Sequence, residues 1–156
     1  MIYIIIFFSA ILVLVLLSKN NTKKFANDPT YKTIYSGKKI LVIDDNEINI
    51  KATRNILTIY GFSVDYFMSG EELKNANIDL NQYCIIMIDE LMPNMNGIDT
   101  LNMLKMKTDN LPPVIALTTE DKLEAKLKLI NNGFTDVLSK PIKNEDLDVV
   151  LFQLFK

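Results

Sequence analysis

Histidine is absent from the 156 residues of this chain, and cysteine occurs only once. Without histidine, the chain cannot contain a Ser-His-Asp or Cys-His nucleophile system, a His-ligated zinc site or a phosphohistidine of its own. The single Cys84 has no partner for an internal disulfide and lies in an apolar run, which favours a buried, unreactive thiol. The five glycines are scattered and form no Walker or dinucleotide loop, which argues against ATP and NAD.

Acidic side chains are nearly absent from the start of the chain and are concentrated in the rest. Residues 1–36 contain four lysines and one aspartate, a net charge of +3. The remaining residues contain 13 of the 17 basic and 18 of the 19 acidic side chains, a net charge of −5. An acidic body without a cluster of Lys and Arg argues against nucleic acid as a direct partner.

The longest apolar stretch covers residues 2–17 and is interrupted only by Ser9. As a helix with a rise of about 1.5 Å per residue it would be about 25 Å long, slightly short of the ~30 Å hydrocarbon core of a bilayer, so its length is borderline. It lacks the basic start and the small-residue cleavage site of a signal peptide. Because the nearest lysines follow it, the rest of the chain is expected to face the cytoplasm. We therefore expect a membrane anchor over residues 1–18; the alternatives are an uncleaved remnant of a longer gene product or an upstream stretch wrongly included in the reading frame.

Residues 19–36 are polar, lack apolar periodicity and are expected to form a flexible linker. After them, short apolar runs alternate with segments of helical spacing, which predicts one α/β domain over residues 37–156. The expected strands cover residues 40–43, 63–67, 85–89, 114–118 and 136–139.

Apolar residues recur at helical spacing between these strands and after the last one, which predicts five helices. Ser69, followed three residues later by Glu72, predicts a capping box at the start of the second helix. The expected apolar faces of the first, fourth and last helices consist of Ile48, Ala52, Ile56 and Ile59; of Leu123, Leu127 and Ile130; and of Leu147, Val150, Leu151 and Leu154.

Strands joined by crossover helices run parallel and are buried on both faces, so we expect a doubly wound sheet. In such sheets, functional residues gather at the carboxyl ends of the strands. Those ends carry Asp44 and Asp45 after the first strand, Asp89 on the third, Thr118 on the fourth and Lys140 after the fifth. Three neighbouring carboxylates repel one another, so we expect a hard divalent cation, Mg²⁺, bound through oxygen ligands.

Each of these residues also has a simpler interpretation. Asp44 and Asp45 could cap a helix, and Asp89 could be an ordinary polar residue of a loop. Thr118 could be an ordinary β-branched strand residue, and Lys140 could be a solvated surface cation. An acid pair, an acid, a hydroxyl and a cation, each at its own strand end, make coincidence the weaker explanation.

Four segments, in this order, resemble the receiver domain of two-component response regulators over about residues 38–156. They are Leu41–Glu47 (LVIDDNE), Ile88–Gly97 (IDELMPNMNG), Ile115–Thr119 (IALTT) and Leu138–Ile142 (LSKPI). The last of them is especially similar to receivers attached to hybrid histidine kinases. The resemblance implies a flavodoxin-like fold whose five parallel strands lie in the order 2-1-3-4-5.

The resemblance also assigns a role to each site residue. Asp89 stands at the position of the phosphoacceptor, which takes a phosphoryl group from the phosphohistidine of a histidine kinase or a histidine phosphotransfer protein. Asp45 and Asp89 would bind Mg²⁺ directly, with Asp44 acting through water and the backbone carbonyl of Leu91 as a further ligand.

Lys140 would pair first with Asp89 and then with the phosphoryl oxygens, and the Lys140–Pro141 bond is expected to be cis. Thr118 would donate its hydroxyl to the phosphoryl group and move towards it. These roles describe a signalling domain rather than an enzyme, one that assists only its own phosphorylation and dephosphorylation.

Some residues depart from the family pattern. Val137 stands where receivers usually carry the aromatic residue of their switch, and Thr119 is bulkier than expected at its position. On the last helix, Val149, Phe152 and Phe155 would form an exposed patch for an effector or a second copy of the chain, unless the two phenylalanines fold back over the domain end. No output domain follows, so we expect regulation by docking.

Three alternatives stay open. Val137 is compatible with a docking adaptor that no longer accepts phosphate. A phosphohydrolase that forms an aspartyl phosphate is a second alternative, but such enzymes typically have another Asp two residues after the nucleophile, where Leu91 stands. Finally, the chain could be the carboxyl-terminal piece of a hybrid sensor kinase.

Overall fold

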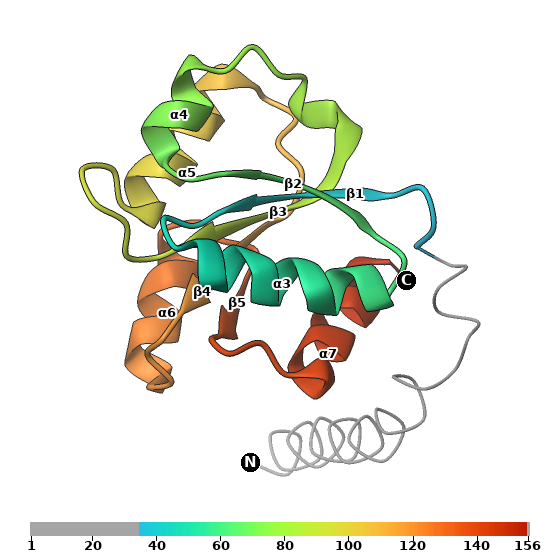
Figure 1. Cartoon of the computed structure of the whole chain (residues 1–156). Helices are drawn as coiled ribbons and strands as arrows, with labels where there is room; N and C mark the ends of the chain where they lie inside the picture. The colour runs from blue at the N-terminus through green and yellow to red at the C-terminus, as the bar shows by residue number, and fades with distance from the viewer. Residues whose placement is uncertain (1–34, 156) are drawn as a thin grey trace, which may run out of the picture.

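The computed structural model describes residues 35–155, and Figure 1 shows how their elements are arranged. The predicted anchor over residues 1–18 lies outside the described residues, as does the predicted linker over residues 19–36 except for its last two positions. Among the described residues, none of the helices has the length and the apolar content needed to cross a membrane.

Five parallel strands form one sheet in the order β2-β1-β3-β4-β5, which confirms the predicted doubly wound sheet. Helices cover both faces of the sheet, so its inner strands are buried on both sides and consist almost entirely of apolar residues. The strands are β1 (Lys39–Ile43), β2 (Ser63–Phe67), β3 (Tyr83–Asp89), β4 (Val114–Thr118) and β5 (Asp136–Ser139).

The helices are α3 (Glu47–Ile59), α4 (Gly70–Asn75), α5 (Gly97–Lys107), α6 (Leu123–Asn131) and α7 (Asn144–Leu154), and a 3₁₀ turn (Leu80–Gln82) precedes β3. Alternate residues of each strand face opposite sides of the sheet. In β1, Leu41 and Ile43 pack in the core formed with α4, α5 and α6, whereas Ile40 and Val42 pack in the core formed with α3 and α7. The site described below therefore rests on two cores, one on each face.

The first two helices begin at side-chain caps close to the carboxyl edge of the sheet. The side chain of Asn46 accepts hydrogen bonds from the backbone N–H groups of Ile48 and Asn49 at the start of α3. At the start of α4, the backbone N–H of Glu72 donates to Ser69 Oγ over 3.0 Å, and Glu72 Oε2 accepts from the backbone N–H of Met68 over 2.7 Å. This reciprocal pair confirms the predicted capping box.

Two of the predicted apolar helix faces are wrong. Helix α3 buries Ile50, Thr53 and Leu57, whereas Ile48 is 75% exposed and Ala52 and Ile59 are also exposed; Ile56 is partly buried. Helix α6 buries Leu129, and the three residues of its predicted face are exposed, Leu123 at 69%. Each helix carries apolar residues on two sides, and helical spacing alone does not decide which side meets the sheet.

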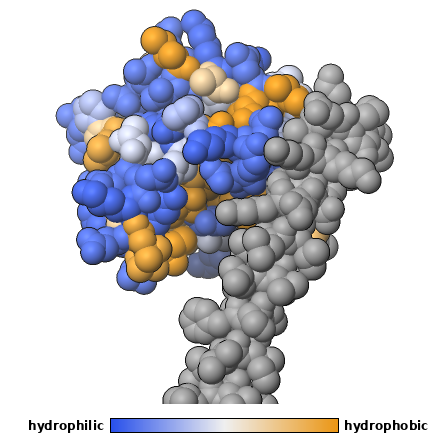
Figure 2. All heavy atoms as spheres, turned by 90° about the horizontal axis from the view of Figure 1, so that it is seen from below, coloured by the Kyte–Doolittle hydropathy of each residue, from blue (hydrophilic) through white to orange (hydrophobic). Residues whose placement is uncertain are grey.

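The prediction for the last helix is confirmed. Leu147, Val150 and Leu151 are buried, and Leu154 packs against the same core. Figure 2 shows one face of the molecule, on which apolar side chains form separate orange areas between hydrophilic ones.

An aromatic cluster lies near the amino ends of β1 and β2, at the opposite end of the strands from the site. Tyr35 is buried and stacks on Phe62, with 4.7 Å between ring centroids, and its ring lies 5.3 Å from that of Phe155. The ammonium of Lys38 lies 5.2 Å from the centroid of the Phe155 ring. Phe155 thus folds back over the domain end, whereas Phe152 and Val149 are exposed.

The only cysteine lies near the amino end of β3. The Cys84 thiol is partly buried and donates to the backbone carbonyl of Lys39 over 3.1 Å. Burial raises the pKa of this thiol, so its reactive thiolate form is disfavoured.

Candidate functional site

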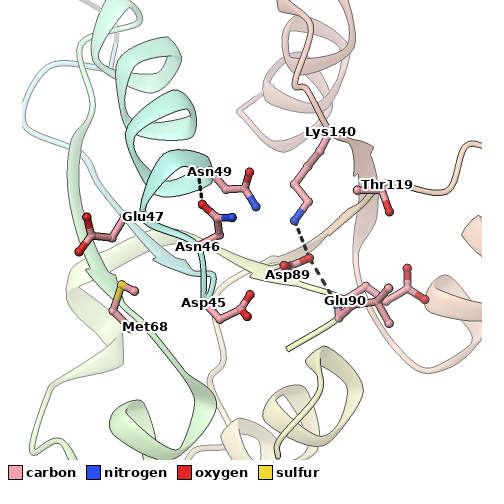
Figure 3. A pocket seen from close by; sticks show the side chains of 10 residues that line it. Asp45, Asn46, Glu47, Asn49, Met68, Asp89, Glu90, Thr119 and Lys140 are labelled. Atoms are coloured by element: carbon pink, nitrogen blue, oxygen red, sulfur yellow. Dashed lines mark hydrogen bonds and ion pairs between the residues drawn. The ribbon is translucent and has the colours of Figure 1, made fainter. Parts of the chain in front are cut away.

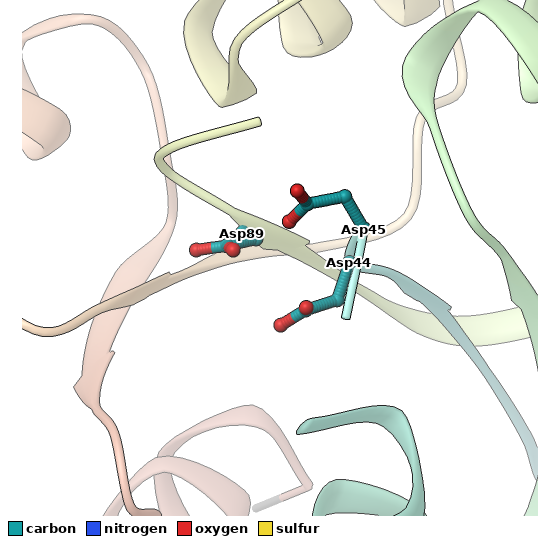
Figure 4. A group of neighbouring side chains, drawn as sticks. All are labelled: Asp44, Asp45 and Asp89. Carbon is teal, nitrogen blue, oxygen red and sulfur yellow. The ribbon is translucent and has the colours of Figure 1, made fainter. Parts of the chain in front are cut away.

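Three carboxylates converge at the carboxyl ends of β1 and β3, which are neighbours in the sheet. Asp44 and Asp45 follow β1, Asp89 ends β3, and one oxygen of each lies within 4.8 Å of the others (Figure 4). Asp44 is fully buried and Asp89 is only 4% exposed, whereas Asp45 is exposed. The cluster therefore opens to solvent on the side of Asp45.

Lys140, which directly follows the carboxyl end of β5, completes the cluster. Its Nζ lies 2.8 Å from Asp89 Oδ1 and 3.2 Å from Asp44 Oδ2, and its side chain is only 12% exposed. The backbone N–H of Lys140 donates to the carbonyl of Thr118 over 2.7 Å, and the bond to Pro141 is cis, as the resemblance implies. One lysine balances one of three carboxylates, so two negative charges remain for a divalent cation.

Asp44 is held by neighbours on its own side of the site. Its Oδ1 accepts from the backbone N–H of Asn46 over 2.9 Å and from the side-chain amide of Asn49 over 3.1 Å. Asn49 was not among the predicted site residues. Its position one turn into α3, just behind the Asp pair, was the signal that could have indicated it.

Burial raises the pKa of Asp89 above its usual range, because a charged carboxylate is poorly solvated there. The nearby charge of Asp44 acts in the same direction, whereas the ion pair with Lys140 and a hydrogen bond from the Leu91 N–H lower the pKa. The balance shows that Lys140 alone does not compensate the burial of this carboxylate. A bound cation would add the missing compensation, which fits the hard oxygen donors present.

Thr118 ends β4 at the same edge of the sheet, as predicted, and is only 1% exposed. Its hydroxyl is directed to Glu90: it donates to Glu90 Oε2 over 2.6 Å and accepts from the backbone N–H of Glu120 over 3.0 Å. Glu90 follows Asp89 directly, and its contact with Thr118 was not predicted.

A pocket of about 450 Å³ opens above the acidic cluster (Figure 3). Leu91 is exposed on it, and whether its backbone carbonyl binds metal stays a prediction. In Figure 3, the Asp89 carboxylate points towards Lys140, and the Asp45 side chain lies beside it. The lining residues are Asp45, Asn46, Glu47, Asn49, Met68, Asp89, Glu90, Leu91, Thr119 and Lys140.

Gly97 determines how the loop after β3 returns to the site. Its backbone N–H donates to the carbonyl of Glu90 over 3.0 Å. A Cβ at this position would lie 2.5 Å from the backbone oxygen of Asp89 and 3.0 Å from Glu90 Cα. A larger residue would therefore displace the backbone that carries Asp89 and Glu90.

Comparison with known proteins identifies the family. The model of the response regulator receiver domain matches residues 40–152, most of the chain. The chain belongs to the receiver domain family. Such domains are signalling modules of two-component systems, and they generally bind Mg²⁺ at an acidic pocket like the one formed here by the three aspartates.

Two of the curated relatives of this receiver domain are much longer signalling proteins. The aerobic respiration control sensor protein ArcB of Escherichia coli is 33% identical over 108 residues, which cover 66% of this chain and 13% of ArcB. Hybrid signal transduction histidine kinase L of Dictyostelium discoideum is 34% identical over 122 residues, which cover 72% of this chain and 7% of the kinase. The receiver domain thus corresponds to a small part of these relatives.

Solved receiver structures share the fold. A receiver domain from Clostridium thermocellum is 29% identical, with a TM-score of 0.65 over 75% of this chain and 93% of that chain. The receiver domain of the histidine kinase CKI1 from Arabidopsis thaliana, complexed with Mg²⁺ and BeF₃⁻, is 25% identical. Its TM-score is 0.67 over 81% of this chain and 95% of that chain.

Proposed function

We propose that this receiver domain is a phosphoacceptor in a two-component phosphorelay. In this proposal, Asp89 accepts a phosphoryl group from the phosphohistidine of a histidine kinase or a histidine phosphotransfer protein. The observation that carries the proposal is the position of Asp89, which is paired with Lys140 beside two further carboxylates in a pocket open to solvent.

The proposed transfer needs little covalent machinery from the domain. An oxygen of Asp89 attacks phosphorus while the bond between phosphorus and the donor imidazole nitrogen breaks. The imidazole leaves with the electron pair of that bond and takes up a proton, and Asp89 becomes an acyl phosphate. Lys140 orients the Asp89 carboxylate and then attracts the phosphoryl oxygens, so positioning and charge balance provide most of the catalysis.

We assign Mg²⁺ to the same pocket. Asp45 and Asp89 are the proposed direct ligands, Asp44 the ligand that acts through water, and the Leu91 carbonyl a further ligand. All of these are hard oxygen donors, which Mg²⁺ prefers. When bound, the ion supplies positive charge that neutralises the phosphoryl oxygens.

The direct test uses the full chain with Mg²⁺ and acetyl phosphate, a small phosphodonor. The expected product has gained the mass of one phosphoryl group, which mild base removes, and peptide mapping places it on Asp89. The Asp89→Asn variant should gain none, while the control Asp109→Asn, which changes an exposed acid far from the pocket, should react like the natural chain. A natural chain that stays unmodified, or a modification that survives in Asp89→Asn, would refute the proposal.

The proposal extends to the location of the domain in the cell. The apolar residues 2–17 would hold the chain in a membrane, with the receiver domain facing the cytoplasm; this rests on the sequence pattern alone. Changing Leu12 and Val13 to lysine should move the full chain from the membrane fraction to the supernatant. The same two lysines at Asn20 and Asn21 are the control and should leave the distribution unchanged.

The output of the domain is also a proposal. Signalling would occur by docking, either to an effector or to a second copy of the chain, through the last helix. The exposed Val149 and Phe152 on α7 support this assignment.

A further inference from the structure

The Thr118 hydroxyl has no donor capacity left for the phosphoacceptor. A hydroxyl carries one hydrogen, and that of Thr118 is donated to Glu90 Oε2 over 2.6 Å. The acceptor is a carboxylate, so this hydrogen bond is of the short, charge-assisted kind. The bond is also shielded, because Thr118 is almost fully buried and Glu90 is partly buried.

We propose that Glu90 is a positioning residue that holds the Thr118 hydroxyl in the unphosphorylated state and releases it when a phosphoryl group reaches Asp89. The inference rests on the proposed function, because the competing acceptor is the phosphoryl group. It assigns to Glu90 control over how readily the phosphorylated state forms.

The backbone around Glu90 keeps its side chain beside Thr118. The N–H of Glu90 donates to the carbonyl of Leu117 over 2.8 Å, and its carbonyl accepts from the N–H of Gly97 over 3.0 Å. Asp89 lies opposite Leu117 in the parallel pairing of β3 with β4, so the next residues, Glu90 and Thr118, also become neighbours. The sheet register thus places the two residues side by side, and the rotamer of Glu90 then directs its carboxylate to Thr118.

Glu90 and a phosphoryl group on Asp89 compete for the single hydrogen that the Thr118 hydroxyl can donate. If Thr118 donates to the phosphoryl oxygens, it must give up its bond to Glu90. The cost of breaking that bond is then part of the free energy of phosphorylation. The Glu90 carboxylate also repels the phosphoryl oxygens, and this second effect acts in the same direction.

Release of Thr118 would also affect the segment that follows β4. The N–H of Glu120 donates to Thr118 Oγ1, so the loop before α6 is bonded to the same hydroxyl. If the hydroxyl moves away from Glu90, the hydrogen bond from the Glu120 N–H must therefore move with it or break. The state of the site is in this way connected to α6, whose outer side carries exposed apolar residues.

A double-mutant cycle separates the hydrogen bond from simple charge repulsion. The affinity of the full chain for fluoroberyllate, a phosphoryl analogue, is measured with Mg²⁺ by titration calorimetry for the natural chain, Glu90→Ala, Thr118→Ala and the double variant. We expect Glu90→Ala to tighten binding about tenfold more when Thr118 is present than when it is replaced, equivalent to about 1.4 kcal/mol. An equal effect of Glu90→Ala in both backgrounds would overturn the proposal.

The conservative variant Glu90→Gln gives a second comparison. Glutamine retains a carbonyl acceptor for Thr118 but lacks the negative charge. Its affinity for fluoroberyllate should lie between those of the natural chain and Glu90→Ala. If it instead equals that of Glu90→Ala, only the charge matters and the hydrogen bond has no role. The matched control Glu124→Ala, on the exposed side of α6, should bind like the natural chain.

A readout without metal or phosphoryl analogue distinguishes failure of this proposal from failure of the phosphoacceptor role. The methyl group of Thr118 is observed by NMR in the full chain, and its couplings report the side-chain rotamer. Glu90→Ala should change them, and Glu90→Gln should retain most of the natural values. If the rotamer responds but no fluoroberyllate binds, the phosphoacceptor role fails. If fluoroberyllate binds but neither the cycle nor the rotamer responds, the role of Glu90 fails alone.

Discussion

The Lys140 ammonium lies 2.8 Å from Asp89 Oδ1, and both side chains are almost completely buried. In a buried ion pair, the loss of one partner costs more than the pair contributes, because the other charge remains without compensation. The cost is larger here because Asp44 shares the same lysine.

Replacement of Lys140 by methionine should therefore reduce both stability and phosphorylation. Without Mg²⁺, we expect the free energy of unfolding to fall by at least about 3 kcal/mol, the lower end of the range for breaking a buried pair, as measured by urea denaturation. Saturating Mg²⁺ should recover part of the loss because it supplies positive charge to the same carboxylates. Lys143→Met, at an exposed position three residues away, should have little effect on either property. A Lys140→Met chain as stable as the natural one would contradict the central place of this pair.

Addition and removal of Mg²⁺ should change the stability of the natural chain. A ligand that binds only the folded state raises the free energy of unfolding, by about 2.7 kcal/mol at 100 times its dissociation constant. We expect the thermal midpoint to rise with Mg²⁺ and to return to its starting value with a chelator. Asp45→Asn should weaken the affinity for Mg²⁺ at least about tenfold, the equivalent of about 1.4 kcal/mol, and so reduce the rise of the midpoint. Asp109→Asn is the matched control, and an unchanged midpoint in the natural chain would argue against a metal site.

Tyr60→Phe tests a buried contact on the side of the sheet that faces α3 and α7. The Tyr60 hydroxyl, just after α3, donates to Asp148 Oδ1 on α7 over 2.7 Å, and Asp148 Oδ2 has no hydrogen-bond partner among the described residues. Removal of the hydroxyl leaves the whole carboxyl group without a partner, which should lower the free energy of unfolding by about 1–3 kcal/mol. Tyr66→Phe, at an exposed position on β2, should be close to neutral in the same denaturant titration.

Asp148 should also make stability depend on pH. Burial raises the pKa of Asp148, and although the Tyr60 hydroxyl lowers it, burial dominates. The folded state then holds the proton more tightly than the unfolded chain, whose carboxyl has a pKa of about 3.9. This contribution is fully present below the unfolded pKa and is lost as the pH rises through the folded pKa.

The variant Asp148→Asn removes this titration. Its stability relative to the natural chain should increase as the pH rises through the same window, in urea titrations without Mg²⁺. Comparison with Asp146→Asn, which changes an exposed acid on the same helix, cancels effects of net charge. A stability difference that is constant with pH would show that Asp148 does not titrate in this range.

The order of the strands and the residues of the acidic cluster could be predicted because they depend on topology. Alternation of strands and helices requires parallel strands, and parallel strands bring their carboxyl ends to one edge. Asp44, Asp45, Asp89 and Lys140 each follow or end a strand, so their convergence needs no knowledge of side-chain rotamers.

The parts that could not be predicted depend on choices within an element. Helix α3 has apolar residues on two sides, and the sheet meets the one with Ile50 and Leu57 rather than the one with Ile48. Likewise, the sequence places Glu90 next to Asp89 but does not say that its carboxylate lies beside Thr118. That contact depends on strand register together with a rotamer, and neither follows from spacing.

Lys140 and Asp44 are separated by 96 positions along the chain, yet their side chains are in contact. The two are brought together by the pairing of β1 with β3, β3 with β4 and β4 with β5, and these pairings join segments far apart in the sequence. A fragment that lacks the segment with Asp44 or the segment with Lys140 therefore loses part of the charged cluster. If the proposed Mg²⁺ site is correct, affinity for a divalent ion would report whether the domain has folded completely.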